Sequence, residues 1–196
     1  MKRLKRIEGE KGLTIMEMLM AALIFAIVST LTALFFIQGS SLWESITGQS
    51  DLRSVARNAM TYMTQELRNA TRTGTGHPSP NMVIPSKPNN HSIDFYLPAD
   101  LDGNLLIIDA LGNTEWDTNN KIQYQYVPGL NILRRLEGGN QYIISHEVSN
   151  IEFEDNSIDS SLAINEVRIK LTLQRLLPQN KTASVSMAAV IRLRNQ

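Results

Sequence analysis

The stretch Lys11-Gly12-Leu13-Thr14-Ile15-Met16-Glu17 decides how this chain of 196 residues is organised, because an apolar segment continues directly from it to Ile37. Glu17 is the single ionisable residue of that segment. A charged side chain in the middle of a membrane helix costs roughly 2.5–3.5 kcal/mol on insertion scales, so such a residue is expected to have a function. The sequence therefore predicts a membrane helix that carries one functional carboxylate close to its start.

The apolar run from Met18 to Ile37 has the length of about 20 residues that a helix needs to cross a bilayer. Residues 1–12 carry five of the chain's 19 basic residues and two of its 19 acidic ones. Since basic flanks stay in the cytoplasm, we expect the chain after Ile37 to lie outside it. A secretory signal would have a shorter apolar core, followed by a cleavage site between small residues, and does not fit.

The same stretch resembles the leader of type IV prepilins and of the pseudopilins of type II secretion. The resemblance rests on a basic leader that ends in Lys11-Gly12, on Glu17 five places after the glycine, and on the uninterrupted apolar helix. Leu13 stands where the family most often has phenylalanine, and Leu34 where many major pilins have a helix-kinking proline. The missing proline favours a minor pilin or a pseudopilin.

This resemblance implies that a prepilin peptidase cleaves between Gly12 and Leu13 and methylates the new amino group of Leu13. The amine would then lie at the same membrane depth as Glu17 of a neighbouring subunit, and the two charges would set the register of assembly. Gly12 has to be small because the peptidase must approach the backbone there. Thr14 and Ile15 are expected to contribute recognition or packing only.

Length and composition fit one membrane anchor followed by one domain of ordinary size. Removal of residues 1–12 would leave a net charge of about −3, so the basic leader reflects membrane topology and not a nucleic-acid partner. The chain has no cysteine, so the exported domain has to rely on its hydrophobic core. The missing cysteines also disfavour a major pilin with a C-terminal disulfide loop.

Helical periodicity continues beyond the membrane segment. Apolar residues recur at steps of three and four, opposite a polar face, as far as about Arg72. The sequence thus predicts a leader over residues 1–12, a membrane and assembly helix over 13–38 and an amphipathic helix over 39–73. Gly39 and Gly48 are expected to mark places where this helix bends or frays.

A linker loop is predicted over residues 74–91 and a β-rich head over residues 92–196. Alternating apolar and polar residues indicate the strands, and Glu137-Gly138-Gly139-Asn140 is typical of a hairpin turn. An apolar run covers Leu105 to Ile108. The expected fold class is α+β, with a long N-terminal helix, one half in the membrane and one half amphipathic, packed on an antiparallel sheet in the manner of pilins.

Short motifs of the head also resemble J-type minor pseudopilins and the similar W-type minor pilins. They follow one another in the order found in that group, and are the segments 92–95, 100–104, 122–126, 133–135, 148–153 and 191–195. The resemblance does not separate the secretion subunit from its pilus counterpart.

Asp100, Asp102 and Asn104 are spaced like the start of a calcium loop, with Gly103 between them. A twelve-residue calcium loop that starts at Asp100 would need a bidentate acid at position 111, which is a leucine. An ordinary acidic turn is therefore the favoured interpretation, and a calcium site is the alternative. No other cofactor is expected. The scattered histidines and the lack of a nucleophile or phosphate-loop motif predict that the chain is not an enzyme.

We therefore expect a minor pseudopilin or minor pilin that primes the tip of a type II secretion pseudopilus or of a type IV pilus. It would sit in the inner membrane as a single-pass protein with a periplasmic head, before joining the filament. Its partners would be other minor subunits, the prepilin peptidase and the inner-membrane assembly platform. The alternatives are a major fibre pilin and an exported enzyme or receptor that uses the helix only as an anchor.

Overall fold

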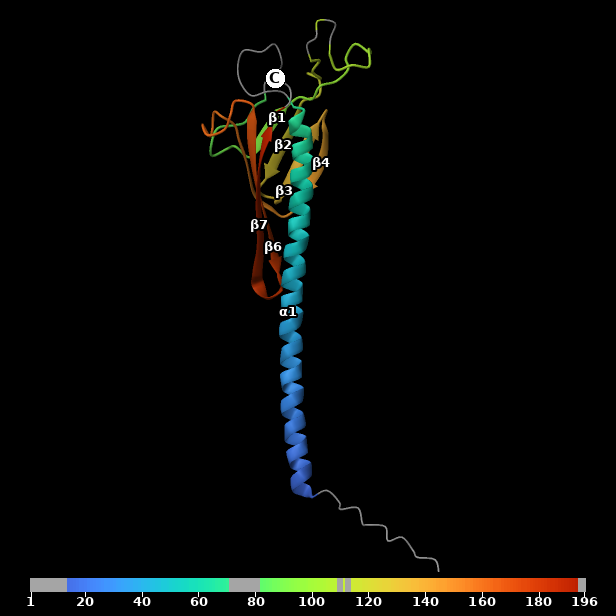
Figure 1. The fold of residues 1–196 in the computed structure, drawn as a ribbon, viewed down its shortest axis with the longest axis vertical. Helices are drawn as coiled ribbons and strands as arrows, with labels where there is room; N and C mark the ends of the chain where they lie inside the picture. The colour runs from blue at the N-terminus through green and yellow to red at the C-terminus, as the bar shows by residue number, and fades with distance from the viewer. Residues whose placement is uncertain (1–13, 71–81, 109–110, 112–113, 194–196) are drawn as a thin grey trace, which may run out of the picture. The chain divides into compact units, whose positions relative to one another are not determined.

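The computed structural model describes residues 14–70, 82–108, 111 and 114–193. One long helix precedes seven strands in these ranges, and every strand pairing is antiparallel, which confirms the α+β class (Figure 1). The chain forms two compact units, Met1–Glu44 and Ser45–Gln196. The boundary lies within helix α1 (Ile15–Arg68), later than the predicted change at residue 38, and each unit is described separately.

In the first unit, every residue of the described chain from Thr14 to Ser40 is exposed. The exposed surface is almost entirely apolar, and α1 is long and apolar enough to cross a membrane. A helix that is apolar all round needs lipid or other helices as its surroundings. This part of α1 can therefore serve as a membrane span.

In the second unit, α1 becomes amphipathic. Its buried residues recur at helical spacing and join the core of the head; they are Gly48, Leu52, Ala56, Ala59, Met60, Met63 and Leu67. The helix ends at Arg68, because the amides of Asn69 and Ala70 bond three residues back, to Glu66 and Leu67, and close a tighter turn. The predicted end at residue 73 was thus too late, and residues 71–73 lie outside the described chain.

Strands β1 (Ser92–Phe95), β2 (Ile122–Val127), β3 (Ile132–Glu137) and β4 (Asn140–Ser145) form one sheet in sequence order. The predicted hairpin between β3 and β4 is confirmed. Its two-residue loop consists of Gly138 and Gly139, with φ of 54° and 86°, which glycine adopts without steric strain.

Strands β5 (Val148–Glu154), β6 (Glu166–Leu177) and β7 (Lys181–Arg192) form a second sheet in that order. A short 3₁₀ turn over Pro178–Asn180 connects the two long strands. The inward residues of β6 are Val167, Ile169, Leu171 and Leu173, and all of them are fully buried. The strict alternation of these strands therefore reflects one face on the core and one on solvent.

The prediction of a single sheet was wrong, because β5 pairs with β6 and not with β4. The two sheets meet at Asn90, which is buried. Its carbonyl accepts from Phe153 N–H (2.9 Å), and its side-chain amide donates to Phe153 O (3.1 Å). The described end of the predicted linker is also part of the fold, because Val83 exchanges two backbone hydrogen bonds with Asp94.

Gly48 does not interrupt the helix, contrary to the expected bend or fray. A Cβ atom at this position would lie 2.6 Å from Cδ2 of Leu177, at the end of β6. Gly39, by contrast, has open space around it. The absent side chain at Gly48 therefore allows the β6–β7 hairpin to approach the helix closely.

A buried polar network connects the helix to the first sheet. Arg135 on β3 forms an ion pair with Glu66 on α1 (2.9 Å) and another with Glu137 (2.6 Å), and the hydroxyl of Tyr124 donates to Glu66. Arg135 is 5% exposed and Tyr124 is fully buried. Burial, together with the charge of Glu66, raises the pKa of Tyr124 far above its usual range, so the phenol remains a donor.

A second network surrounds Glu154 at the end of β5, an acid that is buried and has cations around it. Lys87 lies 2.7 Å and Lys170 2.9 Å from its carboxylate oxygens, and Arg168 pairs with both Glu154 and Asp159. Burial alone would raise the pKa of Glu154, but hydrogen bonds and charges from Lys87 and Lys170 outweigh it and lower that pKa. Hydrogen bonds from Ser161, with the charge of Arg168, lower the pKa of Asp159 to about 2.

These lowered pKa values predict that the head loses stability in acid. A carboxyl group with a depressed folded-state pKa stabilises the fold above its unfolded pKa, near 4.5 for Glu154, and that contribution disappears as the pH falls through the folded value. The urea concentration at which half of the full-length protein in detergent is unfolded should therefore decrease as the pH is lowered from 5 to 2.

Glu154→Gln provides the control for this prediction. We expect it to destabilise the head by about 1–3 kcal/mol at neutral pH, since hydrogen bonds to a charged group are lost. The same variant should show a smaller fall of the midpoint between pH 5 and pH 2. Equal acid sensitivity in both proteins would contradict a role for Glu154.

Candidate functional site

Glu17 lies in the first turn of α1, where it forms a capping box with Thr14. The Thr14 N–H donates to Glu17 Oε2 (2.9 Å), and the Thr14 hydroxyl donates to the same oxygen (3.1 Å). In return, the Glu17 N–H donates to Thr14 Oγ1 (3.3 Å). Thr-x-x-Glu is the sequence pattern of this motif, because the two side chains satisfy amides that the first helical turn leaves unpaired.

The capping box leaves part of the carboxylate available. Glu17 Oε1 makes no hydrogen bond within the described chain, whereas Oε2 accepts two. An ionised carboxylate can accept about four hydrogen bonds, so Glu17 can take a further donor without losing its cap. Its negative charge is also favourable at this end of the helix, where the helix dipole is positive.

The surroundings of Glu17 are apolar, because no other charged residue lies between Thr14 and Trp43. The hydroxyls of Thr30 and Thr32 donate to the carbonyls of Ala26 and Val28, each at 2.8 Å, and are thereby satisfied within their own helix. Glu17 is thus the one charged group on the described surface from Thr14 to Trp43.

The helix surface also has a shallow groove of about 570 Å³ on one side. Small residues and hydroxyls lie between larger apolar side chains there, a composition that lets a second helix approach closely. The lining residues are Val28, Ser29, Thr32, Ala33, Phe36 and Ile37. Beyond them Trp43 is 73% exposed, as expected for an anchor at a membrane–water interface.

The acidic turn of the head contains one more acid than the sequence indicated. Ligand oxygens of Asp100, Asp102 and Glu115 lie within 4.8 Å of one another. Asp100 accepts from the amides of Gly103 and Leu105, both at 2.8 Å, and Glu115 accepts from the Leu101 amide (2.7 Å). The turn is therefore held by its own backbone, and the same three acids could hold a cation.

Asn104 does not join the three acids as a ligand. Its side-chain amide donates to Asp102 Oδ2 (2.8 Å), and its backbone amide donates to both Asp100 and Asp102. Glu115 could not be found from the sequence, because it lies in a separate segment with no ligand spacing to Asp100. Its proximity results from backbone pairing, because Ala99 N–H donates to Glu115 O (3.1 Å) beside the bridge between Pro98 and Trp116.

The predicted cleavage residues Gly12 and Leu13, like the rest of the leader, lie outside the described residues. Of the predicted assembly site, the structure describes Glu17, and it adds Thr14, to which the sequence analysis gave only recognition or packing. The Thr-x-x-Glu spacing was the signal that would have identified the cap. Comparison with known proteins found no matching family model, no similar curated protein and no similar solved structure.

Proposed function

We propose that this chain is a minor subunit of a pilus-like filament, either a type II secretion pseudopilus or a type IV pilus, and that it assembles through the first part of α1. One observation carries the proposal: the first part of α1, over residues 15–40, is exposed and apolar all round, and its single carboxylate lies in the first turn, just after Lys11-Gly12. A simple anchor has no need of an acid at that depth, where it is unfavourable.

In the proposed mechanism, cleavage after Gly12 gives Leu13 a free amino group one residue before the capping box. Oε1 of Glu17 accepts a hydrogen bond from the amine of a neighbouring subunit, while Oε2 remains bound to Thr14. Pairing offsets the desolvation of both charges only at the correct stagger, because a misplaced subunit leaves each charge alone in an apolar environment. The pair therefore selects the register, and the apolar helix surfaces supply the packing.

Membership of a filament also fits the charge and fold of the rest of the chain. The head is an α+β domain without cysteine, and we propose that it lies outside the cytoplasm and meets other minor subunits at the filament tip. The prepilin peptidase and the inner-membrane assembly platform are the partners that this proposal requires. No catalytic step is assigned to the head.

Mass spectrometry of the protein isolated from its own cells tests the proposal. We expect the mature chain to begin at Leu13 and to be one methyl group heavier than the unmodified sequence. Gly12→Val should keep residues 1–12 attached, since the peptidase needs a small residue, whereas Gly9→Val in the same leader should be processed normally. A mature protein that still begins at Met1 would contradict the proposal.

A further inference from the structure

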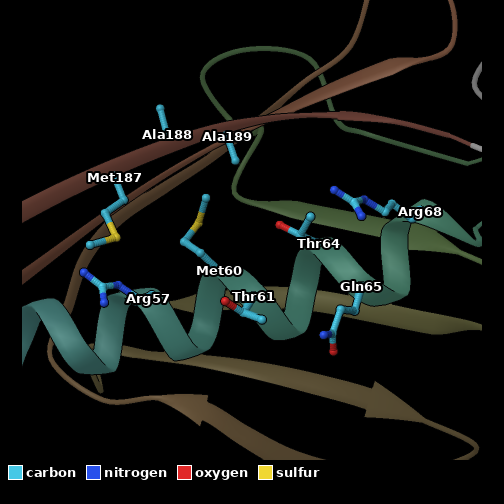
Figure 2. A pocket seen from close by; sticks show the side chains of 9 residues that line it. All are labelled: Arg57, Met60, Thr61, Thr64, Gln65, Arg68, Met187, Ala188 and Ala189. Atoms are coloured by element: carbon cyan, nitrogen blue, oxygen red, sulfur yellow. The ribbon is translucent and has the colours of Figure 1, made fainter.

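A groove of about 490 Å³ lies between the outer part of α1 and strand β7 (Figure 2). Met60 and Met187 contribute apolar side chains from the two sides, with Ala189 beside them. Methionine is flexible and adapts to different partners. The groove lies within the second unit and is separate from the assembly site at Glu17.

The described residues that line the groove include two arginines and no acid. Arg57 and Arg68 line it, and Thr61, Thr64 and Gln65 supply the remaining polar atoms from α1. Both arginines are exposed, and neither forms an ion pair or hydrogen bond in the described part of the chain. The helix acids nearby are already engaged, since Glu66 pairs with Arg135 and Asp51 with Arg175. A negatively charged partner therefore complements this groove.

Strand β7 borders the groove and is an edge strand, because it pairs with β6 alone. The amide of Leu193 donates to Asn165 O (2.9 Å), and these residues stand opposite each other if the register of Glu166 and Arg192 is continued. Hydrogen-bonded and non-bonded pairs alternate along an antiparallel ladder. The odd-numbered residues of β7 therefore bond to β6, and the even-numbered residues direct their N–H and C=O groups outwards.

The outer edge of β7 lacks the features that usually prevent an edge strand from pairing with a further strand. Proteins blunt an edge strand with charges, proline or a β-bulge. Residues 182–191 contain neither charge nor proline, and the β6–β7 register has no shift over its full length, in contrast to the β3–β4 pair. No backbone hydrogen bond from another described segment covers β7. The strand thus offers a regular template for one more strand.

We propose that β7 and this groove bind an acidic, extended segment of a neighbouring filament subunit, which adds to the sheet as a strand. That the occupant is a subunit rests on the proposed function. Arg57 and Arg68 are separated by roughly 16 Å along the helix, which is four to five strand positions at about 3.3 Å each. Since every second side chain faces the groove, the segment places two acids four positions apart, with an apolar residue midway between them.

The first test uses the full-length protein in detergent and a short synthetic peptide. In this peptide, two glutamates lie four positions apart with an isoleucine midway between them, and threonine occupies the remaining positions. We expect binding that weakens with salt, and that becomes about tenfold weaker in the Arg57→Ala, Arg68→Ala double variant. Arg53→Ala is the matched control, because Arg53 is also exposed on α1 and forms no ion pair or hydrogen bond with the residues that the structure describes, but does not line the groove.

Peptide variants test strand addition without any change to the protein. Methylation of the backbone nitrogens that would face β7 should abolish binding, and methylation of the alternate nitrogens should not. Moving each glutamate by one position should also abolish binding, since the acids would then face away from the arginines. Equal binding of all peptides, or equal loss in the Arg53→Ala control, would overturn the proposal.

The second test identifies the occupant in cells, where the absence of native cysteine gives a clean background. Ala188→Cys should crosslink to a cysteine placed in an acidic extended segment of another filament subunit, and Arg57→Glu with Arg68→Glu should prevent it. A crosslink to an exported protein instead would refute the subunit as occupant. If the chain enters filaments but does not form this crosslink, the proposed role of the groove is refuted and the proposed function is not. If the chain never enters filaments, the proposed function is refuted.

Discussion

Glu17→Gln should prevent entry into filaments and leave membrane insertion intact. Glutamine can replace glutamate in a capping box, so the hydrogen bonds with Thr14 are retained and only the charge is lost. The amine of Leu13 in a neighbouring subunit would then have no counter-charge in an apolar environment. Removal of one member of a buried pair costs about 3–5 kcal/mol, which corresponds to a loss of association of at least a hundredfold.

The measurement compares the amount of the protein in sheared filaments with the amount in the membrane fraction. Thr14→Ala is the matched control, because it removes the hydroxyl from the cap and keeps the charge of Glu17. We expect it to weaken the helix start by about 0.5–2 kcal/mol and to reduce incorporation only slightly. If Thr14→Ala were the more damaging change, Glu17 would act as a cap and the helix as an anchor.

The two long strands of the head, β6 and β7, could be predicted because buried and exposed side chains alternate along most of their length. Val167, Ile169 and Leu171 face the core, with Arg168 and Lys170 between them on the solvent side, and this pattern has no other simple explanation. The two adjacent glycines between β3 and β4 likewise predicted the hairpin turn that they form. Local sequence was sufficient wherever the cause of the structure was local.

The remaining features depend on contacts between distant segments. The division into two sheets follows from the pairing of β5 with β6, and Asn90 links the sheets through Phe153. The role of Gly48 follows from Leu177. The apolar run from Leu105 to Ile108 has a core-like composition, yet its side chains are 44–92% exposed in a loop. Without alternation or helical spacing, that run gave no indication of which face, if any, would be covered.

The candidate site shows the same division between local and distant causes. Glu17 stood out because it is the one acid of the apolar segment that ends at Ile37, and its cap partner lies three residues away. Glu115, by contrast, lies near Asp100 and Asp102 because its segment pairs with the backbone of residues 98–99. The groove beside β7 joins residues from α1 and the last strand, and nothing in the spacing of either segment indicates the other.

Arg135→Met should be among the most destabilising single changes in the head. The substitution replaces the guanidinium by an apolar side chain of similar length. It removes the cation that pairs with Glu66, to which the Tyr124 hydroxyl still donates. An acid that has lost its buried partner destabilises the fold by about 3–5 kcal/mol. Thermal and urea unfolding of the full-length protein in detergent, followed by circular dichroism, should show this as a large fall in both midpoints.

Arg134→Met supplies the control, since Arg134 directly precedes Arg135 in β3 and projects to the other face of the sheet. Its guanidinium bonds to the neutral side chains of Gln125 and Gln141, so its loss should cost about 1.5–3 kcal/mol, less than the loss of the Arg135 ion pairs. Adding Glu66→Gln to Arg135→Met should recover part of the stability, because the stranded charge is removed as well. Equal losses in the Arg134 and Arg135 variants, without such recovery, would mean that β3 needs arginine for strand packing and not for its connection to the helix.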